Sequence, residues 1–221
     1  MADRQIVAVG GGDPGPVFDH VLGLVRPAPN VLWVGTAGAE DPAHALTVYD
    51  RFQGRADVRR LEFFPWPPDD LRGLVLAQDV IIVGGGNTAN MLAIWRVHGF
   101  DSLLREAWDR GVVLTGSSAG MICWFEAGVT DSFGPHLDGM RDGLGFLPGS
   151  ACPHYDDEER RRPVYTGLVD GDFPPGYAVD AGVGLHFVGT ELREVVSPRE
   201  GATAYRVEPG VETPLSARAI G

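Results

Sequence analysis

Val-Val-Leu-Thr-Gly-Ser-Ser-Ala-Gly, at residues 112–120, predicts a buried strand that turns at once into a helix. The apolar, β-branched residues 112–115 are typical of a strand covered on both faces, and residues 121–125 are compatible with a helix. Such a turn holds its middle side chain out at the carboxyl edge of a sheet, and glycines on both sides leave room for the strained backbone. Ser118 therefore occupies the reactive position of a nucleophile elbow, above a helix amino terminus that favours negative charge.

The Gly-x-Ser-x-Gly pattern around Ser118 has a second interpretation. It also arises by chance in a chain with 31 glycines, where small residues often cap helices. The strand before it and the helix after it favour the nucleophile. The reactive role then requires a base and an acid elsewhere in the chain.

Length and composition predict a single domain over residues 1–221. At 44% hydrophobic residues, a chain of 221 residues can bury one substantial core. No apolar run reaches the length that spans a bilayer, and the first residues, Met-Ala-Asp-Arg, lack the layout of a signal peptide. We therefore expect a cytoplasmic protein with no membrane partner.

Charged residues and cysteines exclude several classes of protein. The net charge is −12 and no basic run is long enough to follow a phosphate backbone, which argues against a nucleic-acid partner. All 18 basic residues are arginine, which excludes P-loop kinases and ATPases, Schiff-base enzymes and Ser-Lys hydrolases. Histidine is thus the expected activator of Ser118. Cys123 and Cys152 form no disulfide framework, and their spacing does not suggest a metal site.

The rest of the chain alternates apolar runs with helix-like segments. This alternation predicts an α/β fold, with a doubly wound, mainly parallel sheet and helices on both faces. Strands are expected at 5–9, 30–35, 60–64, 79–83 and 112–115, and helices at 18–25, 42–52, 69–77, 88–98 and 101–110. After about residue 128 the pattern is looser. The strands expected at 182–188, 192–196 and 202–207 are antiparallel because their connections are short.

A glycine-rich turn follows the first expected strand. Residues 10–15 match Gly-x-Gly-x-x-Gly, which makes dinucleotide binding an alternative function. Pro14 and Pro16 lack the N–H groups that a pyrophosphate needs, and no acidic residue ends the next strand to bind a ribose. A tight turn near the rim of the active site is therefore the favoured interpretation.

A second glycine-rich turn follows the fourth expected strand. The N–H groups of Gly85 and Gly86 are unencumbered by side chains, and in a parallel sheet they would face the same site as the N–H group of Ala119. Two such donors make an oxyanion hole. Alternatively, these glycines only permit a tight turn into the helix at Thr88.

Two of the six histidines are candidates for the base. His136 and His154 lie in loops rich in Gly, Pro and Asp, where functional residues gather. Pro153 narrows the directions open to the side chain that follows it, so His154 is preferred and His136 is the alternative. The other four lie in helix-like or strand-like segments, where packing explains them: His20, His44, His98 and His186.

A third group should orient the histidine and stabilise its cation. Asp131 comes just after the helix expected behind Ser118, and Asp156 and Asp180 are alternatives. Residue order alone does not choose among these three carboxylates.

Four motifs occur in one order, namely Gly-Gly-Gly-Asn-Thr at 84–88, Gly-Ser-Ser-Ala-Gly at 116–120, Thr130-Asp131 and Pro153-His154. Together they resemble the dipeptidase E family of serine peptidases, also called aspartyl dipeptidases, with cyanophycinases as distant relatives. The likeness runs from the first strand to about residue 190. It implies a flavodoxin-like sheet related to class I glutamine amidotransferases, whose elbow nucleophile is cysteine. Serine at this position argues against amidotransfer.

The resemblance also implies a role for each site residue. The family's nucleophile maps onto Ser118, its base onto His154 and one assigned acid onto Asp131, whereas a glutamate used elsewhere in the family falls at Ala181. An arginine that follows the histidine and binds the substrate carboxylate is best matched by Arg161, which suits a bidentate clamp. Alternatively, that arginine only pairs with neighbouring glutamates at an exposed helix terminus.

The activity that the resemblance implies is removal of an amino-terminal aspartate from short acidic peptides, through an acyl-enzyme and with no cofactor or metal. A cyanophycinase-like or other small-peptide hydrolase is the alternative, and a homo-oligomer is allowed.

Overall fold

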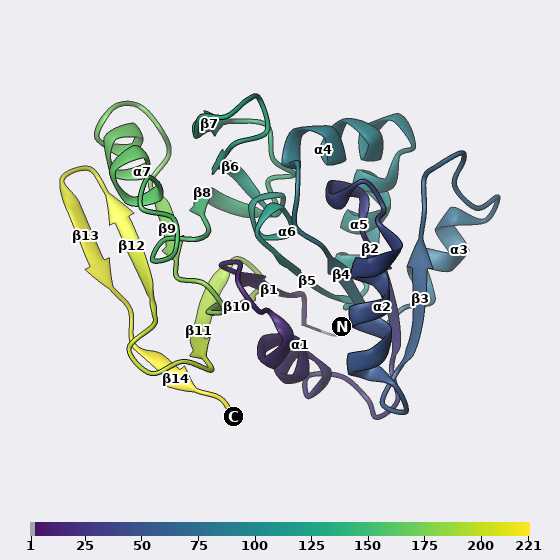
Figure 1. Cartoon of the computed structure of the whole chain (residues 1–221). Coiled ribbons are helices and arrows are strands. Elements are labelled where there is room, and N and C mark those ends of the chain that lie inside the picture. Colours follow the sequence, from purple (N-terminus) through teal and green to yellow (C-terminus); the bar gives the residue numbers. More distant parts are fainter. Residues whose placement is uncertain (1–2) are drawn as a thin grey trace.

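The computed structural model describes residues 3–221. These residues form two β-sheets with helices packed against them (Figure 1). The strands of the larger sheet are β1 (Gln5–Val9), β2 (Asn30–Val34), β3 (Asp57–Leu61), β4 (Val80–Val83), β5 (Val113–Ser117), β10 (Gly184–Val188), β11 (Glu191–Ser197) and β14 (Ala217–Ala219). Their order across the sheet is β14-β11-β10-β1-β5-β4-β2-β3. Strands β1 to β5 are parallel to one another, and β10 is antiparallel to both β1 and β11.

Helices cover both faces of this sheet because successive strand residues point to opposite sides. Val7 and Val9 pack with α1 (Gly15–Leu22) and α2 (Pro42–Phe52) on one face. Ile6 and Ala8 belong to the cluster on the other face, where α3 (Leu71–Leu76), α4 (Thr88–Val97) and α5 (Phe100–Asp109) lie. The predicted doubly wound α/β class is confirmed.

The strand order predicts a ligand site at the carboxyl ends of the central strands. Strands β3, β2, β4 and β5 follow the order 2-1-3-4 of the flavodoxin-like arrangement, and β1 takes the fifth place. The chain crosses from β2 to β3 in one direction along the sheet and from β4 to β5 in the other, so the crossover direction reverses between β2 and β4. In such sheets ligands bind outside the carboxyl ends of the strands at this switch point, where the short helix η1 (Thr36–Gly38) follows β2.

The second sheet differs from what the sequence predicts after residue 120. The helix after Ser118, α6 (Ala119–Ile122), has only four residues, and Phe125 already belongs to a strand. The strand expected at 202–207 lies in this sheet instead of the larger one. Its strands, in the order β13-β12-β9-β8-β6-β7, are β6 (Phe125–Thr130), β7 (Asp138–Met140), β8 (Leu147–Cys152), β9 (Gly176–Val179), β12 (Ala204–Glu208) and β13 (Val211–Pro214), and α7 (Arg161–Asp170) packs beside them.

Aromatic side chains fill the core between the two sheets. Trp108 stacks on Phe146, and Trp124 lies against the same ring, with all three buried. Phe125 and Phe187 meet edge to face across the sheets. Within residues 3–221, every helix is too short or too polar to cross a membrane.

Candidate active site

Ser118 sits on a strained turn between β5 and α6. Its backbone has φ of 58° and ψ of −111°, a conformation that costs a residue with a side chain about 1–3 kcal/mol. A Cβ atom added to Gly116 would lie 2.5 Å from the carbonyl oxygen of Gly120, and one added to Gly120 would lie 2.3 Å from that of Val83. Both glycines of the Gly-x-Ser-x-Gly pattern are therefore required by close packing, as the nucleophile elbow predicts.

The imidazole of His154 reaches the hydroxyl group of Ser118. Its Nε2 atom lies 3.0 Å from Oγ of Ser118, although the two residues are separated by 36 positions. His154 follows β8 and Pro153 and also has a positive φ, 58°. Two strained residues thus face each other across one hydrogen bond, which is the arrangement that activates a serine nucleophile.

The first glycine-rich turn fixes the position of His154. The backbone N–H of His154 donates to the carbonyl oxygen of Gly10 at 2.6 Å. A Cβ atom on Gly11, whose φ is +106°, would lie 2.2 Å from Cε1 of the imidazole. The structure thus bears out the interpretation of residues 10–15 as a tight turn at the rim of the site.

Two carboxylates that the sequence analysis did not select face the other ring nitrogen. Nδ1 of His154 lies 3.2 Å from Oδ1 of Asp157 and 3.8 Å from Oε1 of Glu158. A proton on Nδ1 donated to Asp157 leaves Nε2 free to accept the hydroxyl proton of Ser118. A sequence signal existed, because residues three and four positions after a histidine share its side of a helical turn, and the N–H of Glu158 does donate to the His154 carbonyl oxygen.

The structure corrects the predicted acid, because none of the three candidates forms a hydrogen bond or ion pair with the imidazole of His154. Asp131 is exposed at the end of β6 and lines a separate cavity with Glu158 and Arg160. Asp156 accepts from the N–H of Ala181 and pairs with Arg199. Asp180 accepts from the N–H of Thr203. Instead of a longer helix, β6 follows the elbow, and Ser132, next to Asp131, accepts hydrogen bonds from Asn87 and Ala89 at the start of α4.

The second glycine-rich turn lies beside the elbow. Pairing of β4 with β5 sets Val83 opposite Gly116, and a Cβ atom on Gly85 would lie 3.2 Å from Cβ of Ser118. Within residues 3–221, the N–H groups of Gly85, Gly86 and Ala119 donate no hydrogen bond. These N–H groups are therefore available to an oxyanion. They would act as individual donors, since a helix of four residues has only a small dipole.

A cavity of about 510 Å³ opens beside Ser118 and His154. Residues from α1, β2 and α2 complete its wall, and they include Phe18, Trp33, His44, Arg51 and Phe52. Nε of Arg51 and Nε1 of Trp33 are buried nitrogen atoms without a hydrogen-bond partner among residues 3–221. These two atoms are covered by protein, whereas the Arg51 side chain as a whole is 33% exposed and lines the cavity.

The structure also corrects the predicted carboxylate clamp. The side chain of Arg161 is 4% exposed and does not line this cavity. Its Nε donates to Glu158 at 2.7 Å and its Nη1 to the carbonyl oxygen of Val129 at 2.8 Å. Arg161 therefore holds Glu158 beside the imidazole of His154 and is a positioning residue.

Arg51 is the guanidinium group that faces the cavity. Its Nη2 donates to Asp19 at 2.6 Å, and Arg55 donates to the same carboxylate at 2.8 Å. Two positive charges against one negative charge leave this group with a net charge of about +1. Residue order did not reveal Arg51, because only the packing of α2 over the sheet brings it to the site.

Neither thiol competes with Ser118 as a nucleophile. Cys123 and Cys152 are free and fully buried, and burial raises the pKa of the Cys152 thiol well above its usual range.

Comparisons with known proteins show the family and the fold of this chain. The profile of peptidase family S51 matches residues 6–195. A Bacillus subtilis protein named uncharacterized peptidase YgaJ is 44% identical over 99% of this chain and 100% of its own length. Peptidase E of Shewanella denitrificans is 26% identical over 91% of this chain and 90% of its own. A crystal structure of a peptidase from an acI-B1 actinobacterium shares the fold, with a TM-score of 0.70, 18% identity, and coverage of 97% and 95% of the two chains.

Proposed function

This chain belongs to peptidase family S51 and is a serine peptidase, and we propose that it removes an amino-terminal aspartate from short acidic peptides through an acyl-enzyme. The observation that carries the proposal is the 3.0 Å approach of His154 Nε2 to Ser118 Oγ on a turn with φ of 58°. A serine held in this way needs no cofactor to attack a peptide carbonyl group.

The proposed reaction has two halves. Ser118 Oγ attacks the carbonyl carbon of the aspartyl residue while Nε2 of His154 takes the hydroxyl proton. Asp157 stabilises the imidazolium ion that forms, and the N–H groups of Gly85, Gly86 and Ala119 bind the oxyanion. The C–N bond then breaks, His154 returns the proton to the leaving amine, and water hydrolyses the aspartyl ester by the same steps.

Two features support a short, acidic substrate. A cavity of about 510 Å³ is in the range of small-molecule sites. Arg51 lines it with a side chain that is 33% exposed, and its guanidinium can bind the carboxylate of an aspartyl side chain. We therefore assign to Arg51 the recognition role that the sequence analysis gave to Arg161.

A fluorophosphonate probe with mass mapping tests the nucleophile. We expect one label per chain, on Ser118, and no label on Ser118→Ala. That variant should also lose hydrolysis of Asp-Leu while keeping its thermal unfolding midpoint. Ser102→Ala, on the exposed side of α5, is the matched control and should behave like the unaltered protein. Labelling of another residue, or unchanged turnover by Ser118→Ala, would exclude the mechanism.

A substrate panel tests the specificity separately. We expect kcat/KM for Asp-Leu to exceed the values for Ala-Leu and for a β-linked Asp-Arg dipeptide. A preference for the β-linked peptide would favour a cyanophycinase-like activity, and equal rates for all three would indicate a general small-peptide hydrolase.

A further inference from the structure

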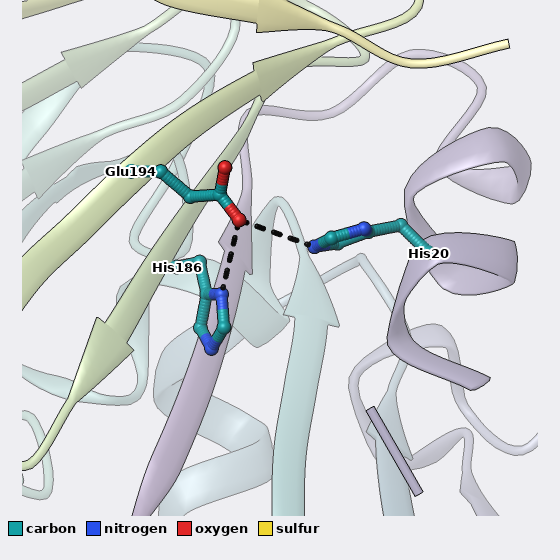
Figure 2. A group of neighbouring side chains, drawn as sticks. All are labelled: His20, His186 and Glu194. Carbon is teal, nitrogen blue, oxygen red and sulfur yellow. Dashed lines mark ion pairs between the residues drawn. The ribbon is translucent and has the colours of Figure 1, made fainter. Parts of the chain in front are cut away.

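Three side chains from separate elements meet on another part of the larger sheet. His20 lies on α1, His186 on β10 and Glu194 on β11, and none of them lines the cavity beside Ser118. Figure 2 shows both imidazoles directed at the same carboxylate oxygen of Glu194. Nε2 of His20 lies 3.8 Å and Nδ1 of His186 lies 3.6 Å from that oxygen, Oε1. From the sequence, both histidines are expected to be packing residues only.

The two ring nitrogens that face Glu194 have no hydrogen-bond partner. Nε2 of His20 and Nδ1 of His186 are both buried and unpaired among residues 3–221, and the whole of His186 is 5% exposed. Their distances to Oε1 are too long for hydrogen bonds. Buried polar atoms are normally paired, so two unpaired atoms aimed at one carboxylate point to a missing ligand.

A hydrogen bond on the far side of His186 sets the state of its ring. Nε2 of His186 lies 2.9 Å from Oε1 of Gln5, a carbonyl oxygen that can only accept. Nε2 therefore carries a proton, and in the neutral ring Nδ1 presents a lone pair to the carboxylate. A histidine that donates one N–H to a neighbouring oxygen and directs its other nitrogen inward has the arrangement of a metal ligand.

We propose that His20, His186 and Glu194 bind one divalent transition-metal ion, for which Zn²⁺ is the best match. Two imidazole nitrogens and one carboxylate oxygen are a known ligand set for zinc, with a fourth position left for water. The three ligand atoms lie within 4.8 Å of one another. Zinc bonds of about 2.0–2.2 Å at the tetrahedral angle would separate ligand atoms by about 3.3–3.5 Å, so a small side-chain rotation closes the site.

Arg218 sets a limit on the affinity. Its Nε donates to Oε2 of Glu194 at 2.7 Å and its Nη2 donates to Oε1 at 3.2 Å. These bonds orient the carboxylate, yet the guanidinium charge repels a cation. Removal of this charge by Arg218→Gln should therefore leave metal binding intact or strengthen it.

The bound ion would connect α1 to the antiparallel edge of the sheet. Helix α1 begins directly after the glycine-rich turn that packs against His154, and its Phe18 lines the cavity. The ion would therefore stabilise the fold beside the active site without contacting Ser118.

Calorimetric titration of the whole, metal-stripped protein with Zn²⁺ tests the site. We expect one ion per chain and a higher thermal unfolding midpoint when it is bound. His20→Gln and Glu194→Gln should each weaken binding by more than about 100-fold, because changes behind a ligand already cost about 10–100-fold. His136→Gln, at an exposed loop residue, and His154→Ala should bind Zn²⁺ with unchanged affinity. Co²⁺ should give visible absorption bands in the same variants that bind Zn²⁺.

Three results would each overturn the inference. The unaltered protein could bind no Zn²⁺, in which case the cluster is only two histidines packed beside a glutamate. Binding could persist in both His20→Gln and Glu194→Gln, or it could be lost in His154→Ala, which would place the ion at the active site. Near-ultraviolet circular dichroism of each metal-free variant separates loss of a ligand from loss of the fold. None of these outcomes depends on the proposed peptidase specificity.

Discussion

Asp157→Asn isolates the carboxylate that orients the base. The substituted amide retains the shape of the side chain, and Oδ1 of Asp157 lies 3.2 Å from Nδ1 of His154. An amide nitrogen turned toward Nδ1 donates a hydrogen bond there and leaves the ring proton on Nε2. In that tautomer Nε2 cannot accept the hydroxyl proton of Ser118.

The structure sets the size of the expected loss. In a buried Ser-His-Asp site the same exchange lowers kcat by about 10⁴-fold. Here the Asp157 side chain is 43% exposed, so solvent screens its charge, and Glu158 lies 3.8 Å from the same nitrogen as a partial substitute. We therefore expect kcat to fall by about 10²–10³-fold, or about 2.7–4 kcal/mol of transition-state stabilisation.

Steady-state hydrolysis of Asp-Leu, followed by release of the free amino acids, measures this loss. KM should change little, because Asp157 acts through His154 and does not line the cavity. Asp131→Asn is the matched control and should stay within about threefold of the unaltered enzyme, while Asp157→Asn combined with Glu158→Gln should lose more than either change alone. A threefold or smaller loss in Asp157→Asn, or a greater loss in Asp131→Asn, would refute the assignment.

Three other perturbations address the turn, the cavity and the core. Gly11→Ala should lower kcat/KM by more than about 100-fold, because its Cβ would displace the imidazole of His154. Gly54→Ala, also at positive φ but in open space, is the control and should cost only about 1 kcal/mol of stability. Equal kcat/KM values for these two variants would contradict this account. Arg51→Gln should raise KM for Asp-Leu by about 10–100-fold and leave Ala-Leu almost unchanged, whereas a similar rise for both peptides would remove Arg51 from carboxylate recognition. Burial raises the pKa of Tyr165, so above about pH 10 the unfolded chain loses a proton that the folded protein keeps, and the free energy of unfolding falls by about 1.4 kcal/mol per pH unit. Denaturant titrations at pH 9 to 11 should show a shallower fall of this free energy with pH for Tyr165→Phe. The same fall in both proteins would argue against a retained proton.

Features that depend on adjacent residues were predictable. The elbow at Ser118 was found because a strained turn requires small neighbours, and Gly116 and Gly120 leave no space for a Cβ atom. The turn at residues 10–15 was interpreted correctly because Pro14 and Pro16 remove donors. The parallel sheet followed from continuous apolar runs, since a strand covered by helices on both faces has no polar side.

Features that depend on long-range packing were predicted less well. Apart from β12, the strands of the second sheet were missed because they are short and contain glycine or proline. They are stabilised by pairing between segments such as β6 and β8. Asp131 was preferred because the family resemblance assigns the acid to that position, whereas the approach of Asp157 to His154 depends on the turn formed by residues 154–158.

Local sequence was therefore enough to predict Ser118 as the nucleophile and to prefer His154 to His136, because backbone strain and the lack of side chains at glycine act over a few residues. The groups around them needed the folded chain. Arg51 reaches the cavity because α2 crosses the face of the sheet, and His20, His186 and Glu194 meet because α1, β10 and β11 pack side by side. Contacts of this kind depend on strand order and helix packing. These bring together residues that lie far apart in the sequence and show no regular spacing.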